Sequence, residues 1–190
     1  MEKRNAEFIM GSFCEHMDPV SVLDYRYGTE QMRTIFRANS YLQALLEVEA
    51  TLAEVQEEKN IIPKGTSSKI RKGISGVKRE RVEEIESEIN HDVMAVVKAL
   101  EEQSEDAGKW IHFGATSYDI VDTARALQHK KAVALLEIAI DKLIDSLAHL
   151  ANEHKSTVML GRTHGQWATP ITFGLKMAVF TSELKRHRDR

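Results

Sequence analysis

Residues 117–155 read SYDIVDTARALQHKKAVALLEIAIDKLIDSLAHLANEHK, and apolar side chains recur along them at helical spacing. Ser117 is expected to cap one long helix, with Asp119 in the first turn, where a carboxylate is favourable. The predicted helix far exceeds the average length of about 11 to 12 residues, so partner helices must cover its apolar positions. These positions are Ile120, Ala124, Leu127, Leu135, Ile138, Leu143, Leu147 and Leu150. The stretch therefore predicts an elongated helical bundle.

Similar patterns predict further helices on both sides of this stretch. Thr169–Pro170 is a start signal, because threonine caps well and proline suits the first helical position. The chain has only three prolines and ten glycines, so few residues interrupt a helix. The predicted fold class is therefore all-α. We expect helices over residues 40–59, 77–102 and 169–190, and a short segment over 110–114 that is extended.

Composition limits the class of protein. Hydrophobic residues make up 42% and charged residues 29%, which is ordinary for a globular chain, and the formal net charge of −3 argues against a basic nucleic-acid module. No stretch reaches the roughly 18 apolar residues of a membrane span, and the N-terminus does not read as a secretory signal. Cys14 stands alone, which excludes an internal disulfide and a cysteine metal cluster. We therefore expect a cytoplasmic protein that binds neither nucleic acid nor a membrane.

Two polar segments before the long helix are candidate binding sites. Arg26–Gly28 precedes a helix that Thr29 is expected to cap, and an arginine beside a helix start suits an anion. A surface arginine before a turn is the simpler interpretation. Asn90–Asp92 falls within the predicted helix 77–102, where neighbouring residues do not face each other. Taken alone, this segment favours a structural role.

Two further polar segments flank the long helix. Thr116 and Ser117 follow Gly114, and two hydroxyls with free helix N–H groups suit a carboxylate or phosphate. Residues 161–170 crowd arginine, threonine, histidine and glutamine between two apolar helices. Polar groups in a bundle are unfavourable unless they are paired or used, and His164 is suited to proton transfer near neutral pH. Here a functional role is favoured over a structural loop.

Together the four segments resemble the fumarase/aspartase superfamily of helical lyases, and within it the adenylosuccinate lyase family. The resemblance covers nearly the whole chain from about residue 19. It implies a small N-terminal helical domain, residues 1–109, followed by the first long helices of a central bundle, residues 110–190. The matching motifs are R-Y-G from Arg26, H-D-V from His91, W-x-H-x-G-x-T-S-x-D from Trp110 and G-R-T-H-G from Gly161.

The family resemblance also implies a reaction without metal or organic cofactor. Fumarate is eliminated from adenylosuccinate to give AMP, and from the succinyl-aminoimidazole carboxamide ribotide of purine biosynthesis. His164 would be the general acid that protonates the leaving nitrogen, and His91 would assist it. The implied substrate-binding residues are Thr116 and Ser117 for a succinyl carboxylate, Arg26 and Tyr27 for the phosphate, and Asn90, Asp92, Thr163 and Gln166.

The chain departs from the family pattern in places. Asn90 stands where the family usually has arginine, and Trp167 and Thr169 replace a histidine and a glutamate, which we interpret as a subgroup difference. The family's serine base lies on a loop that is expected beyond residue 190. The resemblance therefore implies the N-terminal part of a homotetrameric lyase, with active sites built from three subunits, and a 190-residue chain that is inactive alone.

Two alternatives remain open at this stage. The chain could belong to another lyase of the superfamily, such as an argininosuccinate lyase or a carboxymuconate cycloisomerase. It could also be a non-catalytic helical module that binds a partner through exposed apolar faces. Recognition of AMP is expected of an adenylosuccinate lyase and not of the other lyases. Loss of small-anion binding on changing Thr116 or Ser117 would favour a lyase site over a non-catalytic module.

Overall fold

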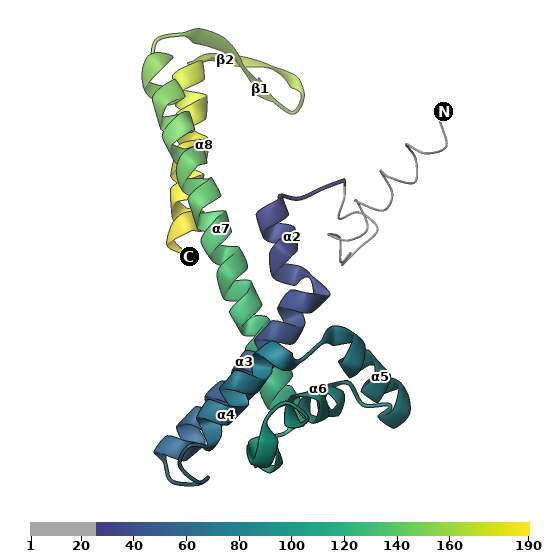
Figure 1. Ribbon diagram of the computed structural model, residues 1–190. Coiled ribbons are helices and arrows are strands. Elements are labelled where there is room, and N and C mark those ends of the chain that lie inside the picture. The colour runs from purple at the N-terminus through teal and green to yellow at the C-terminus, as the bar shows by residue number, and fades with distance from the viewer. Residues whose placement is uncertain (1–25) are drawn as a thin grey trace, which may run out of the picture. The chain divides into compact units, whose positions relative to one another are not determined.

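The computed structural model describes residues 26–190, and it is mainly helical with one small sheet (Figure 1). The predicted all-α class is confirmed. Cys14 lies outside the described residues. The chain divides into two compact units, Met1–Lys131 and Ala132–Arg190. The domain boundary expected between residues 109 and 110 stays a prediction.

The first unit is built around α3. Its helices enclose one apolar core, in which Leu46, Ile70 and Leu100 are fully buried. Gln128, on the first part of α7, donates a hydrogen bond to the Ile35 carbonyl at 2.6 Å, which ties α2 to α7. The elements are α2 (Glu30–Phe36), α3 (Ala38–Glu58), α4 (Thr66–Gly73), η1 (Ile74–Gly76), α5 (Arg79–Ile89), α6 (Asp92–Glu101), η2 (Glu105–Trp110) and the start of α7 (Ser117–Glu153).

The prediction of a single helix over residues 77–102 is wrong. The chain breaks at Asn90, which adopts a left-handed conformation with φ of 54° and ends α5. Asparagine tolerates this conformation better than most residues. The His91 ring then accepts a hydrogen bond from the Met94 N–H at 3.3 Å and caps α6. The interruption therefore places His91 at a helix start instead of a helix interior.

Two further local expectations fail in the first unit. Helix α4 was not expected, and it is held by tertiary contacts: the Glu57 carboxylate accepts hydrogen bonds from the N–H groups of Gly65 and Ser67, each at 2.8 Å. The extended segment expected over residues 110–114 is a 3-10 turn followed by a loop, because Trp110 ends η2. Both segments are too short for a periodic pattern to identify them.

The second unit comprises the rest of α7, a β-hairpin and α8 (Phe173–Asp189). Helix α7 extends to Glu153, which confirms the long helix. Strands β1 (Val158–Thr163) and β2 (Gln166–Thr172) pair antiparallel, with a register shift at Gly161. Helix α8 returns along α7: the Phe173 N–H bonds to the Thr157 carbonyl, and Arg188 binds Asp141 near the other end (Figure 1).

The prediction that a helix begins at Thr169–Pro170 is wrong. Both residues lie in β2, and α8 begins at Phe173 with Thr172 as its cap, which accepts a hydrogen bond from the Leu175 N–H at 3.1 Å. Pairing with β1 satisfies the backbone of this segment, and a two-stranded ribbon has free edges that tolerate the missing N–H of a proline. The polar segment around His164 is therefore a hairpin.

Within residues 26–190, the structure contains no helix that is long and apolar enough to cross a membrane.

Candidate functional site

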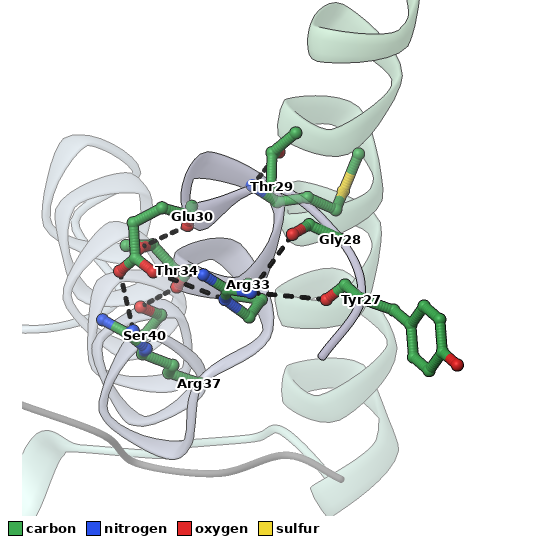
Figure 2. A network of polar contacts seen from close by, with 9 residues as sticks. Tyr27, Gly28, Thr29, Glu30, Arg33, Thr34, Arg37 and Ser40 are labelled. Atoms are coloured by element: carbon green, nitrogen blue, oxygen red, sulfur yellow. Dashed lines mark hydrogen bonds and ion pairs between the residues drawn. The ribbon is translucent and has the colours of Figure 1, made fainter. Parts of the chain in front are cut away.

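The segment Arg26–Gly28 is a turn at the start of α2. Arg33 donates hydrogen bonds to the carbonyl oxygens of Tyr27, at 3.4 Å, and Gly28, at 3.1 Å. Thr29 accepts a hydrogen bond from the Met32 N–H, which confirms the predicted cap. Figure 2 shows the Tyr27 ring pointing away from these contacts, and its side chain is 69% exposed. The backbone of the turn is held while Tyr27 stays accessible.

Glu30 joins two arginines behind this turn. Its carboxylate binds Arg33 at 3.0 Å and Arg37 at 2.7 Å (Figure 2). The hydrogen bond from Arg33, followed by the charge of Arg37, holds the pKa of Glu30 below its usual value, although limited desolvation opposes them. Exposed ion pairs contribute little to stability, because water screens the two charges. The network therefore orders the start of α2 more than it stabilises the whole chain.

Asn90–Asp92 forms the junction between α5 and α6. The His91 Nδ1 accepts the Met94 N–H, so the proton of a neutral ring lies on Nε2. Asp92 accepts the Val93 N–H at 2.8 Å, and its carboxylate lies 3.6 Å from the His91 Nδ1, too far for a hydrogen bond. The side chains are 46% and 74% exposed. His91 can therefore present an Nε2–H donor to a ligand.

Thr116 and Ser117 stand at the start of α7. The helix begins at Ser117 itself, one residue earlier than expected, and the Asp119 carboxylate accepts the Thr116 N–H at 2.9 Å. Among the described residues, neither hydroxyl has a recorded hydrogen-bond partner. The two hydroxyls can therefore bind a ligand. The backbone N–H of Thr116 cannot, because it already donates to Asp119.

His164 occupies the turn of the β-hairpin. His164 and Gly165 have φ of 50° and 72°, as a two-residue turn of the mirror-image type requires. Thr163 and Gln166 pair directly across the turn, so their side chains share one face of the ribbon. All four residues are exposed. The hairpin thus presents a histidine flanked by a hydroxyl and an amide.

The structure positions these segments individually. Those around Arg26, His91 and Thr116 belong to the first unit and His164 belongs to the second. The hydrogen bonds named above for His91, Asp92 and Thr116 each join residues no more than three apart in sequence. A shared site formed by the predicted residues stays a prediction.

A buried acid–histidine pair was not expected from the sequence. Glu49 on α3 is only 1% exposed, and its carboxylate lies 2.6 Å from the His112 Nδ1 and accepts the His112 N–H at 3.1 Å. Burial raises the pKa of Glu49, although the hydrogen bonds and charge of His112 oppose this rise. One signal was available: Glu49 lies among Leu45, Leu46 and Ala53 on the apolar face of its helix, where a carboxylate is unusual.

An open groove of about 590 Å³ adjoins the same loop. It lies between α3 and the first turns of α7, and apolar side chains contribute most of its walls. Its lining includes Val48, Leu52, Val55, Gly114, Ala115 and Ile120. The described residues contain no group of three or more histidine, cysteine, aspartate or glutamate side chains that could hold a metal ion.

Comparisons with known proteins give a consistent result. A family model described as lyase matches residues 24–190. Adenylosuccinate lyases of Methanocaldococcus jannaschii and Pyrococcus abyssi are each 47% identical, over 174 and 173 residues, which is 90% of this chain and 38% of theirs. The chain thus spans about 38% of the length of these curated relatives.

Two solved structures share the fold. A fumarate lyase from Mesorhizobium sp. BNC1 superposes with a TM-score of 0.79 at 36% identity, over 86% of this chain and 40% of that one. A β-carboxy-cis,cis-muconate cycloisomerase from Acinetobacter calcoaceticus gives 0.81 at 28% identity, over 89% and 41%.

Proposed function

The chain belongs to the lyase family whose model matches residues 24–190, and from this premise we propose that it supplies the N-terminal part of an adenylosuccinate lyase. The reaction releases fumarate from adenylosuccinate and leaves AMP, and it splits the succinyl-aminoimidazole carboxamide ribotide in the same way. The observation that carries the proposal is the 47% identity to adenylosuccinate lyases over 90% of the chain.

The elimination needs one base and one acid. A base removes the proton beside a carboxylate, the C–N bond breaks, and the leaving nitrogen takes a proton from His164. The hairpin turn supports this role, because it holds the His164 ring at an exposed tip. A serine on a segment beyond residue 190 is the proposed base. His91, whose Nδ1 is occupied by the Met94 N–H, assists by donating from Nε2 to developing negative charge. The reaction uses no metal or organic cofactor.

The remaining predicted residues hold the anionic parts of the substrate. Thr116 and Ser117 bind a succinyl carboxylate, an assignment that their place at the positive end of the 37-residue helix α7 supports. Arg26 and Tyr27 bind the nucleotide phosphate. Asn90, Asp92, Thr163 and Gln166 complete the substrate contacts.

The whole protein is a homotetramer in this proposal. Exposed apolar side chains on the second unit support further helical packing, because such side chains favour burial. The active sites then combine segments of three subunits, so His91 and His164 need not meet within one chain. The cytoplasmic location stays a prediction. The apolar side chains are Leu136, Ile138 and Leu143 on α7 and Leu175, Val179 and Phe180 on α8.

The replacement His164→Asn tests the proposal in the full-length protein. Asparagine tolerates the left-handed turn, so the hairpin is kept while the acid is lost. We expect kcat for adenylosuccinate cleavage to fall by about 10²- to 10⁴-fold, with AMP binding retained. The matched control is His149→Asn on α7, whose side chain is 78% exposed and which should leave kcat unchanged. An unchanged kcat in His164→Asn contradicts the assignment of the acid.

A second candidate is a carboxymuconate cycloisomerase. The structural likeness to such an enzyme, with a TM-score of 0.81, is as close as that to the fumarate lyase, but the sequence identity is only 28%. Assaying both substrates with one preparation separates the two functions: turnover of carboxymuconate without cleavage of adenylosuccinate favours the cycloisomerase.

A further inference from the structure

Glu49 is a buried acid that the proposed reaction does not use. It lies in the middle of α3, is 1% exposed, and packs in the apolar core of the first unit. A carboxylate in such a place is unfavourable unless its partners offset the loss of water. Its partners are two nitrogens of one residue, His112, which lies 63 positions later in the chain.

The two contacts restrict where a proton can lie between Glu49 and His112. The His112 N–H donates to one carboxylate oxygen at 3.1 Å, and the other oxygen lies 2.6 Å from the ring nitrogen Nδ1. When the Glu49 carboxylate is ionised it only accepts hydrogen bonds, and Nδ1 must then carry the proton. A neutral ring then has its lone pair on Nε2. The short distance fits a charge-assisted hydrogen bond.

The same contacts hold an unusual stretch of backbone. His112 has φ of 61°, in the left-handed region that non-glycine residues rarely adopt. Gln56, two turns further along α3, donates to the Phe113 carbonyl at 2.6 Å. The loop from His112 leads within five residues to Thr116 and Ser117. Helix α3 thus anchors the loop that carries the proposed carboxylate-binding hydroxyls.

Anchoring alone does not require an acid. A glutamine at position 49 has one oxygen for the His112 N–H and one NH₂ group for Nδ1, and it avoids burying a charge. The carboxylate differs in one respect, which is the ring nitrogen that it forces to be protonated. Burial raises the pKa of Glu49, so ionising this side chain in the core is less favourable than ionising it in water, and a glutamine avoids that cost.

We propose that Glu49 is a positioning residue that holds the His112 ring in the Nδ1–H form and keeps the loop to Thr116 and Ser117 in its binding conformation. The effect on catalysis rests on the proposed function, whereas the protonated nitrogen of His112 does not. Glu49 acts through His112 and is not itself a catalytic residue.

The first experiment measures ring protonation by ¹⁵N NMR on the full-length protein with labelled histidine, near neutral pH. The His112 signals are assigned by their loss in His112→Gln. We expect Nδ1 to be protonated in the unaltered protein. In Glu49→Gln the amide must donate to Nδ1, so the proton is expected on Nε2 alone. The control Gln56→Met removes the other anchor of the loop and should leave His112 protonated as before.

Two results overturn the proposal. One is an unprotonated Nδ1 in the unaltered protein. The other is the same Nδ1 protonation in Glu49→Gln. A kinetic arm then tests the consequence. We expect Glu49→Leu, which loses both contacts to His112, to lower kcat/KM for adenylosuccinate by roughly 100-fold. An unaltered protein that cleaves no adenylosuccinate refutes the proposed function and leaves the NMR result standing. Normal kcat/KM in a folded Glu49→Leu refutes the positioning role.

Discussion

Arg33 connects two parts of the candidate phosphate-binding segment. Its guanidinium binds Glu30 on its own helix and donates to the carbonyls of Tyr27 and Gly28 in the preceding turn (Figure 2). Both acceptors are backbone carbonyl oxygens without net charge. The two hydrogen bonds from Arg33 therefore hold the backbone of the turn in place. Arg33 therefore positions the turn that carries Arg26 and Tyr27 and need not touch a ligand itself.

Replacing Arg33 with alanine tests this role. We expect the dissociation constant for AMP to rise about tenfold, equivalent to about 1.4 kcal/mol, because the turn loses both donors. Calorimetric titration of the full-length protein measures the change. Arg37→Ala is the matched control, since Arg37 also binds Glu30 at 2.7 Å. Equal affinity in the two variants would show that Arg33 does not position the turn.

Single residues also explain which local features were predictable. The Thr29 cap was predicted correctly, because a capping side chain contacts a backbone group only three residues away. Asn90 was missed, because asparagine disfavours a helix interior only modestly and one such residue does not interrupt the apolar pattern on both sides of it. Glu49 was missed because its partner, His112, is distant in sequence.

At the level of elements, the β-hairpin is the feature that most changes the expected site. Periodicity predicted a loop followed by a helix, whereas residues 158–172 form two paired strands. The strands are short, and His164–Gly165 is a weaker turn signal than the Asn-Gly or Asp-Gly pairs that mark such hairpins. Pairing of distant backbone groups overrode the helix start signal at Thr169–Pro170.

Gly161 is needed where the register shifts. A Cβ atom at this position would collide with the Thr169 carbonyl oxygen on β2. We expect Gly161→Ala to destabilise the hairpin by about 1–3 kcal/mol and to speed hydrogen exchange of its amides. Hydrogen-exchange mass spectrometry measures this effect. Arg162→Ala, which changes an exposed neighbour, should leave the protection unchanged; unchanged protection in Gly161→Ala would argue against the close approach.

The long helix was predicted nearly to the residue. Most neighbouring apolar positions from Ile120 to Leu150 are three or four residues apart, and the helix runs from Ser117 to Glu153. Such a pattern is reliable because many turns repeat the same signal. Helix α4 is only 8 residues long and offers too few repeats, so contacts such as Arg71 with Glu47 and Glu54 determine it.

For the whole molecule, the activity expected of this chain follows from how much of its relatives' length it covers. The chain spans 38% of the length of similar adenylosuccinate lyases, and the proposed base lies outside it. We expect the 190-residue chain alone to release no measurable fumarate from adenylosuccinate, because proton abstraction has no base. Absorbance of fumarate gives the rate, and circular dichroism verifies that the chain is helical. Turnover at a rate comparable to the full-length protein would refute both the missing base and the need for further subunits.

The sequence by itself determined the helical class, the long helix and the family, because each depends on periodicity or on motifs that are local in the chain. It also identified the candidate residues, although their union in one site stays a prediction. The tertiary structure decided the hairpin around His164, the break at Asn90 and the Glu49–His112 pair. The physical reason is that backbone pairing and burial of a charge depend on partners brought together by folding, and no local pattern encodes those partners.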